Sequence, residues 1–132
     1  MHLRLWMLPV PIDTTFDEQR RVFVHVASGS VGPGDVLSAV ATRPTNAVEL
    51  PAFWDIRGAT LEISKQDLST WPSDAAISRV KKLRRGSKTA VVTSNSEQTR
   101  FVSEDFAPKL STVEMRAFQD DPDAALDWLT AP

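Results

Sequence analysis

The second half of the sequence alternates short apolar runs with amphipathic stretches, and this alternation restricts the fold more than any other feature. The runs at 89–93 and 113–118 have the length and composition of strands. The stretch after each run has helical periodicity, and the last one covers 121–129. Parallel strands need a long crossover connection, which is usually a helix. Strand, helix, strand and helix in this order therefore predict an α/β layer.

The first half of the chain supplies further strands for the same sheet. Two apolar runs at 12–16 and 21–27 flank the polar residues 17–20, which predicts a β-hairpin. The second run has few polar side chains on either face, with His25 among apolar neighbours, so we expect it in the centre of the sheet. We expect Gly29 and Gly32-Pro33-Gly34 to end this strand and to begin a helix.

A third apolar run at 48–56 predicts another strand, which we expect to end at Arg57-Gly58. Capping residues, prolines and apolar periodicity indicate where the helices lie. They are expected at 34–42, at 64–71, from 73 or 74 to 85, after the capping residues 94–97 with an end near Pro108, and at 121–129. All these elements fit a single α/β domain over 1–132, with residues 1–10 as an N-terminal arm or edge strand.

The composition excludes several classes of protein. The sequence has no cysteine, so it forms no disulfide, thiolate zinc site or cysteine nucleophile, and this suits the cytoplasm. Its net charge is −2, without the excess expected of a general nucleic-acid binder. The apolar residues 1–8 are too short to span a membrane and lack the features of a secretion signal. We therefore expect a cytoplasmic protein that binds no nucleic acid and does not insert stably into membranes.

No group of residues has the pattern of a catalytic or metal site. His25 is one of two histidines and has no second histidine at metal-ligand spacing, so we expect a packed, hydrogen-bonded core residue. The serines at 28 and 30 lack the Gly-x-Ser-x-Gly pattern of a nucleophile elbow. The acidic residues within 120–123 are typical of a helix start. We therefore expect no enzymatic activity, no cofactor and no metal ion.

Ser94, Asn95 and Ser96 are candidate ligand-binding residues. They follow the carboxyl end of the strand at 89–93 and begin the next helix, where free backbone amides and the helix dipole can bind an anion. The alternative is that these side chains only cap the helix, as they do in most α/β connections.

Two groups of residues are candidate contacts with a protein partner. Leu3, Leu5 and Trp6 form an apolar patch in the N-terminal arm. Arg84 and Arg85 belong to a basic cluster that also contains Arg79, Lys81, Lys82 and Lys88. This cluster is either a solvated helix end or a contact for an acidic partner or a phosphate. We expect all four tryptophans to pack in the core or at an interface.

Five segments carry a family resemblance through their order and spacing. They are 24–29, 53–59, 88–92, 116–118 and 124–129. Together they resemble the small stand-alone SpoIIAA-like proteins of the STAS superfamily, whose architecture is related to that of CRAL-TRIO lipid-binding domains. The resemblance implies a mixed, mainly parallel sheet of four to five strands flanked by helices, and no enzymatic activity.

The resemblance also implies a regulatory serine. In regulatory STAS domains, a serine after an aspartate is phosphorylated to control partner binding, and the nearest match is Ser64. It follows Ile63, and Lys65 and Gln66 replace the usual serine and glycine neighbours. Considered by itself, Ser64 is expected to be the N-cap of the helix that follows.

Two functions remain open at this point. One is a non-catalytic STAS-like protein that acts through protein contacts as a regulatory interaction module, with a second copy of itself as the expected partner. The other is a binder or carrier of a small apolar or anionic ligand, as the relation to CRAL-TRIO domains suggests. The first requires an exposed apolar patch on the arm, and the second requires a pocket between helices and sheet.

Overall fold

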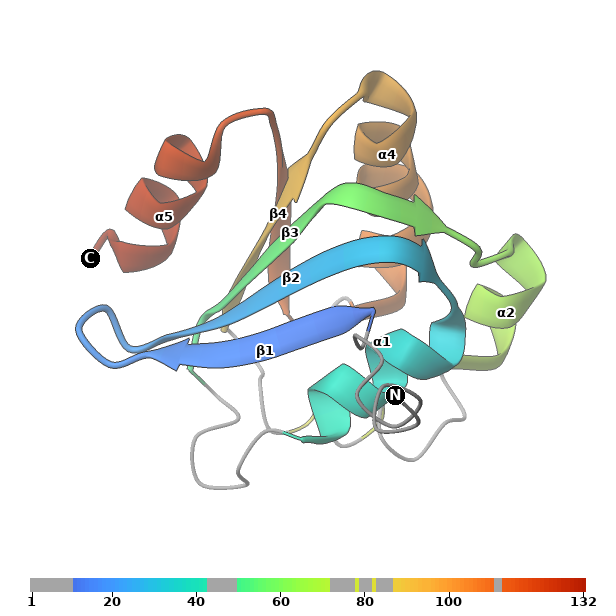
Figure 1. The fold of residues 1–132 in the computed structure, drawn as a ribbon, viewed down its shortest axis with the longest axis horizontal. Coiled ribbons are helices and arrows are strands. Elements are labelled where there is room, and N and C mark those ends of the chain that lie inside the picture. Colours follow the sequence, from blue (N-terminus) through green and yellow to red (C-terminus); the bar gives the residue numbers. More distant parts are fainter. Residues whose placement is uncertain (1–10, 43–49, 72–77, 79–81, 83–86, 111–112) are drawn as a thin grey trace, which may run out of the picture.

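The computed structural model describes residues 11–42, 50–71, 78, 82, 87–110 and 113–132. Five strands form one sheet, and their order in the sheet follows the chain from β1 to β5 (Figure 1). The hairpin strands β1 and β2 are antiparallel, and every later neighbour is parallel. The bounds are β1 Ile12–Asp17, β2 Val22–Val31, β3 Ala52–Leu61, β4 Lys88–Thr93 and β5 Glu114–Gln119. The predicted hairpin and the mixed, mainly parallel sheet are confirmed.

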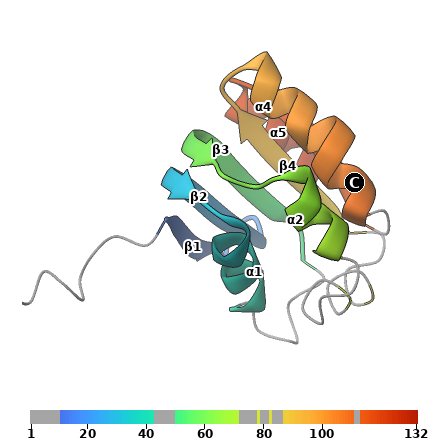
Figure 2. The same cartoon turned by 90° about the vertical axis from the view of Figure 1, so that its right-hand side faces the viewer.

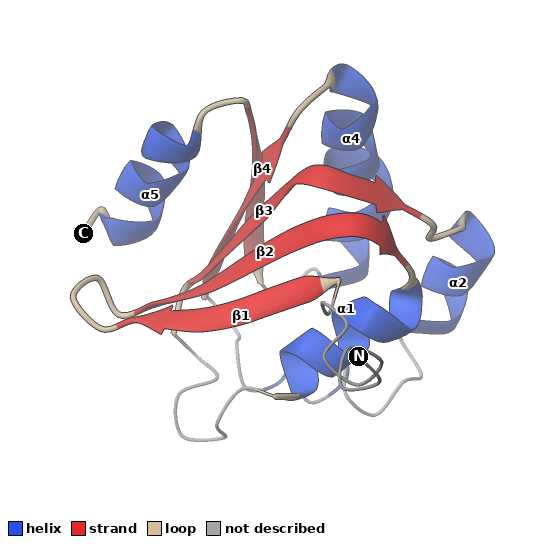
Figure 3. Ribbon diagram, in the orientation of Figure 1, coloured by secondary structure: helices blue, strands red, loops and turns tan. Residues whose placement is uncertain are grey.

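Helical segments flank this sheet (Figure 3). They are α1 Pro33–Ala41, α2 Lys65–Thr70, α4 Ser96–Arg100, the π-helical segment η4 Phe101–Phe106, the 3-10 segment η5 Ala107–Leu110 and α5 Pro122–Thr130. The expected break of the second helix near Trp71 is confirmed, because α2 ends at Thr70. The expected restart lies outside the described residues, except for Ser78 and Lys82, which are helical.

The two faces of the sheet have different coverings. Crossovers between parallel strands are almost always right-handed, so strands that advance in one direction place their connecting helices on the same face. Figure 2 looks onto this face, where α1, α2 and α4 lie in front of the strands. The opposite face is covered by α5, which packs on β3, β4 and β5. We call these faces the crossover face and the α5 face.

Each face has its own apolar core. On the α5 face, Ala125 and Leu129 of the last helix are buried against the sheet, as their spacing predicts. Trp128 is half-buried, and its ring lies 5.8 Å from that of Phe118. The sheet contributes Val22, Phe53, Ala90 and Val92 to this core. A larger cluster on the crossover face joins all three connecting segments to the sheet.

β2 ends at Val31, directly before the predicted Gly32-Pro33-Gly34, but the predicted ends at Gly29 and at Arg57-Gly58 are wrong. Gly29 and Arg57-Gly58 lie inside β2 and β3, which pair for several residues beyond them. A register shift between Val26 and Ser28 lets the two strands continue, and Gly29 then pairs with Ala59. Gly29 has a φ of +69°, a conformation that favours glycine. Here glycine permits an irregular strand to continue instead of ending it.

The expectation that β2 is shielded on both faces is wrong at Val26. His25 and Val22 are fully buried, but Val26 on the α5 face keeps 44% of its surface exposed. The reason is that α5 covers this face only over β3, β4 and β5 and leaves it uncovered at Val26 on β2.

Asp55 and Arg57 form an ion pair on β3 that gives the fold a small dependence on pH. The guanidinium Nη2 lies 2.8 Å from Asp55 Oδ2, and Nε donates to Oδ1 at 3.0 Å. These side-chain hydrogen bonds from Arg57 hold the pKa of the Asp55 carboxyl below its ordinary value of 3.8. The stabilisation is therefore complete above that value and is lost as the pH falls through the lower folded-state pKa.

We expect acidification below about pH 4 to destabilise the natural protein more than the Asp55→Asn variant. The difference should stay below about 1 kcal/mol, because the pair is partly exposed. Urea unfolding at several pH values measures it. In the Asp55→Asn background, Arg57→Gln should leave the acid dependence unchanged. Equal acid dependence of the natural protein and Asp55→Asn would show that this ion pair does not contribute.

Candidate functional site

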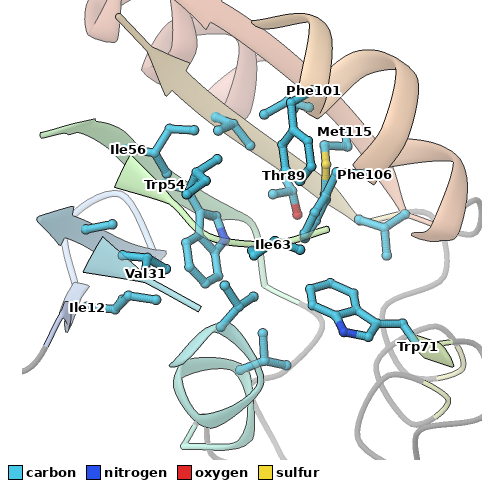
Figure 4. A pocket seen from close by; sticks show the side chains of 17 residues that line it. Ile12, Val31, Trp54, Ile56, Ile63, Trp71, Thr89, Phe101, Phe106 and Met115 are labelled. Carbon is cyan, nitrogen blue, oxygen red and sulfur yellow. The ribbon is translucent and has the colours of Figure 1, made fainter. Parts of the chain in front are cut away.

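A pocket lies between the crossover face of the sheet and the segments α1, α2 and η4 (Figure 4). Its volume is about 70 Å³. One water molecule needs roughly 10–15 Å³ on a comparable scale, so several waters or a small organic molecule fit. The lining side chains are Ile12, Ala27, Val31, Val36, Val40, Trp54, Ile56, Leu61, Ile63, Trp71, Thr89, Val91, Phe101, Val102, Phe106, Val113 and Met115.

Aromatic rings form much of the wall between α2 and η4. The ring of Trp71 meets that of Phe106 edge-on, with centroids 5.1 Å apart. Phe101 lies 6.2 Å from Phe106 between ring centroids. The π-helical turn explains this pair, because its i→i+5 hydrogen-bond pattern brings residues five apart to the same side. The sequence predicts a helix carrying these phenylalanines but not the π-helical turn that pairs them.

Trp54 brings a further aromatic ring to the pocket from β3, and His25 fixes its position. The imidazole on β2 stacks on the indole at 4.0 Å between centroids, with 22° between the planes. His25 is fully buried, and its Nδ1 lies 2.8 Å from Thr14 Oγ1. The predicted packed and hydrogen-bonded histidine is confirmed. Stacking against a fixed ring restricts the rotation of Trp54 and keeps this wall of the pocket in place.

Thr89 is the single hydroxyl-bearing residue among the lining side chains that the structure describes. It lies on the interior strand β4 between Ala52 on β3 and Met115 on β5. Only 2% of its surface is exposed, and its Oγ1 has no hydrogen-bond partner among the described atoms. Figure 4 shows this oxygen among the apolar side chains of the pocket. A buried hydroxyl without a partner is uncommon and costs roughly 1–3 kcal/mol.

The predicted ligand-binding residues Ser94, Asn95 and Ser96 lie apart from the pocket lining. Asn95 Oδ1 accepts from the Gln98 amide at 2.8 Å and caps α4. The amide of Ser94 donates to Gln98 Oε1 at 2.8 Å. These bonds favour the capping alternative, whereas anion binding there stays a prediction. The strand order also contains no reversal, and ligands in α/β sheets usually bind at such a reversal.

Ser64 is the N-cap of α2, as predicted. Its Oγ accepts from the Asp67 amide at 3.0 Å, and Asp67 Oδ2 accepts from the Ser64 amide at 2.8 Å. The serine is exposed. Its phosphorylation stays a prediction from the family resemblance.

The predicted partner contacts Leu3, Leu5, Trp6, Arg84 and Arg85 lie outside the described residues. Contact with a second copy or another protein through them therefore stays a prediction.

Within the basic cluster, Lys88 is described and has a structural role. Its Nζ donates to the Trp128 carbonyl at 3.0 Å and lies 5.2 Å from the centroid of that indole.

Comparison with solved structures connects this architecture to a known fold. An uncharacterized protein of the DUF3478 family from Shewanella loihica PV-4, whose crystal structure has a SpoIIAA-like fold, superimposes with a TM-score of 0.54. The match covers 89% of this chain and 91% of that chain, at 19% sequence identity. The fold is SpoIIAA-like. No protein-family model matches the sequence, and the search of curated proteins found no match.

The SpoIIAA-like fold confirms the architecture that the sequence segments imply. None of the described helices is long and apolar enough to span a membrane. The sequence suggested a pocket between helices and sheet only as a requirement of the second function, and it did not indicate the lining residues Trp54, Phe101 and Thr89 as a site. The available signal was Thr89, one of two threonines on the same face as Val91 in the strand 89–93.

Proposed function

We propose that this protein binds a small, largely apolar molecule in the pocket between the crossover face and the segments α1, α2 and η4. The observation that carries the proposal is the pocket itself, which is lined by apolar and aromatic side chains except at Thr89. Small-molecule sites are typically apolar clefts with a few placed polar groups. Of the two functions that the sequence left open, this structure supports the second, in its apolar form.

The lining disfavours an anionic ligand. No charged side chain is among the lining residues in the described part of the chain. A buried charge without a counter-charge or several hydrogen bonds is strongly unfavourable. The proposed ligand is therefore apolar and uncharged. The proposed activity is to bind or carry this ligand and not to catalyse a reaction.

The proposal predicts that toluene binds to the purified protein and that Val36→Phe weakens this binding at least about tenfold. Val36 lies on α1, is 7% exposed and lines the pocket, so a phenyl ring at this position occupies ligand space. Toluene titration followed by NMR measures the affinity. Native mass spectrometry of freshly purified protein should also reveal a retained small molecule, which its mass would characterise.

Val26→Phe is the matched control, because it introduces the same ring on the opposite face of the sheet, at an exposed position. It should leave toluene affinity unchanged. Thermal unfolding followed by circular dichroism verifies that both variants are folded. If the natural protein neither retains a molecule nor binds toluene, the proposed function is wrong. Equal weakening by both phenylalanine variants would place the binding elsewhere.

A further inference from the structure

We infer that the ligand carries one uncharged hydrogen-bonding group, such as a hydroxyl, carbonyl or N–H, which pairs with Thr89 Oγ1. This inference rests on the proposed function and specifies the chemistry of its ligand: a small aromatic or otherwise apolar body with a single polar atom. The observation behind this inference is a buried Thr89 hydroxyl without a partner in a pocket of apolar and aromatic side chains.

Thr89 lines the pocket, and its hydroxyl is hidden from bulk water. Thr89 lies in β4, an interior strand of the sheet, and is 2% exposed. Its neighbour on β3 is Ala52, whose side chain carries no polar group that could pair with the hydroxyl. Since the hydroxyl can both donate and accept, it can pair with an O–H, an N–H or a carbonyl.

A second threonine on the same strand shows that the unpaired state of Thr89 is specific to the pocket. Thr93 faces the same side of the sheet and is fully buried. Its Oγ1 lies 2.6 Å from Thr99 Oγ1, so this hydroxyl is satisfied within the protein. Thr93 is not among the lining residues. Of these two buried threonines, the one at the pocket is the one whose hydroxyl has no partner.

A water molecule is a poor substitute for the ligand group. Buried waters typically make two to four hydrogen bonds. Beside Thr89 Oγ1, the described lining side chains offer only the indole N–H groups of Trp54 and Trp71 as further strong polar groups. A ligand that fills the apolar space and presents one polar atom at Thr89 satisfies the hydroxyl and displaces poorly held water at the same time.

The aromatic lining indicates a flat ligand body. Trp54, Phe101 and Phe106 approach the pocket from two sides of the space, as Figure 4 shows. Aromatic rings pack favourably edge-to-face or offset against such side chains. Para-cresol has such a ring and one hydroxyl, and toluene is the same molecule without the hydroxyl, so the two form a matched pair of probes.

The test compares the affinities for para-cresol and toluene in the natural protein, Thr89→Val and Thr93→Val. Valine has nearly the shape of threonine but no hydroxyl. We expect Thr89→Val to weaken para-cresol binding about tenfold, which is about 1.4 kcal/mol, and to leave toluene binding unchanged or tighter. The ratio of the two dissociation constants should therefore change about tenfold in Thr89→Val and stay constant in Thr93→Val. This double comparison isolates the hydrogen bond from shape and desolvation.

The outcomes separate this inference from the proposed function. If toluene binds but Thr89→Val leaves the ratio unchanged, the pocket binds apolar molecules and the inference about Thr89 is wrong. If neither probe binds the natural protein, the proposed function fails first. Benzoate, which carries a carboxylate on the same ring, should bind at least about 100-fold more weakly than para-cresol near neutral pH. Comparable benzoate binding would overturn the uncharged character of the ligand.

Discussion

Replacing Trp71 by alanine is expected to lower the free energy of unfolding by about 3–5 kcal/mol. Trp71 is 3% exposed, follows α2 directly and belongs to the apolar core of the crossover face. Its ring also meets Phe106 edge-on. The truncation therefore removes a large buried surface and one aromatic contact between α2 and η4, and leaves a space continuous with the pocket. Urea unfolding followed by far-UV circular dichroism measures the loss.

Trp128→Ala is the matched control, because it makes the same chemical change on the α5 face. Trp128 is half-buried, so its truncation should cost less than half as much. Domains of this size typically have only 5–15 kcal/mol of stability, so Trp71→Phe serves as a milder variant with an expected loss of about 1–2 kcal/mol. Equal losses for Trp71→Ala and Trp128→Ala would show that the crossover face is not the more tightly packed core at this position.

The second large effect is expected at Gln98, whose side chain joins β3 to the start of α4. Pairing of β3 with β4 ends at Asp55. Beyond this point, Gln98 Nε2 donates to the carbonyls of Ile56 and Ala59 at 3.2 and 3.1 Å. Its Oε1 accepts from the amide and the hydroxyl of Ser94 at 2.8 and 3.1 Å. The side-chain amide of Gln98 thus makes four hydrogen bonds beyond the point where β3 and β4 stop pairing.

Gln98→Leu should lower the free energy of unfolding by about 2–3 kcal/mol, because it removes the partners of two carbonyls and one amide in a half-buried region. Gln66→Leu on α2 is the control, since Gln66 is exposed; it should change stability by less than about 0.5 kcal/mol. Urea unfolding measures both. A loss at Gln98 no larger than at Gln66 would contradict the bridging role.

Gln98→Glu separates the hydrogen bonds that Gln98 Nε2 donates from those that Gln98 Oε1 accepts. A carboxylate still accepts from Ser94 but faces the two carbonyls without a donor. On acidification the carboxyl gains an O–H that can donate to one carbonyl. The stability difference between Gln98→Glu and the natural protein should therefore shrink as the pH falls, whereas the Gln98→Leu difference should not. The same pH dependence in both variants would contradict this assignment of donors and acceptors.

Features that depend on a few neighbouring residues were predictable from the sequence. Ser64 and Asp121 cap their helices because a cap needs only the next three residues. The bounds of β4 at 88 and 93 agree with the apolar run and its flanks. The order of such elements also predicted the mixed α/β sheet.

Features that depend on distant partners were not predictable. The continuation of β2 and β3 past Gly29 and Gly58 depends on a register shift between two strands, which neither segment shows by itself. Gln98 has its partners 42 and 39 residues away, at Ile56 and Ala59. The exposure of Val26 depends on where α5 packs.

The pocket was the least predictable feature, because it is a space left between elements that are far apart in the chain. Its aromatic residues are typical of any core, and their spacing gives no signal for a cavity. Thr89 is also ordinary in sequence terms, since threonine is common in strands. Only the packed structure shows that its hydroxyl lacks a partner while that of Thr93 has one.

The strand order also has a consequence for how the chain folds. From β2 onward, each strand pairs with the strand that precedes it in the chain, which is already synthesised. The hairpin can form early, and each new strand then adds to an existing edge, which limits the loop entropy lost at every step. By contrast, α5 is needed to cover its face and comes last. A chain truncated before Pro122 would retain all five strands but expose Phe53 and Val92, and we expect such a product to aggregate.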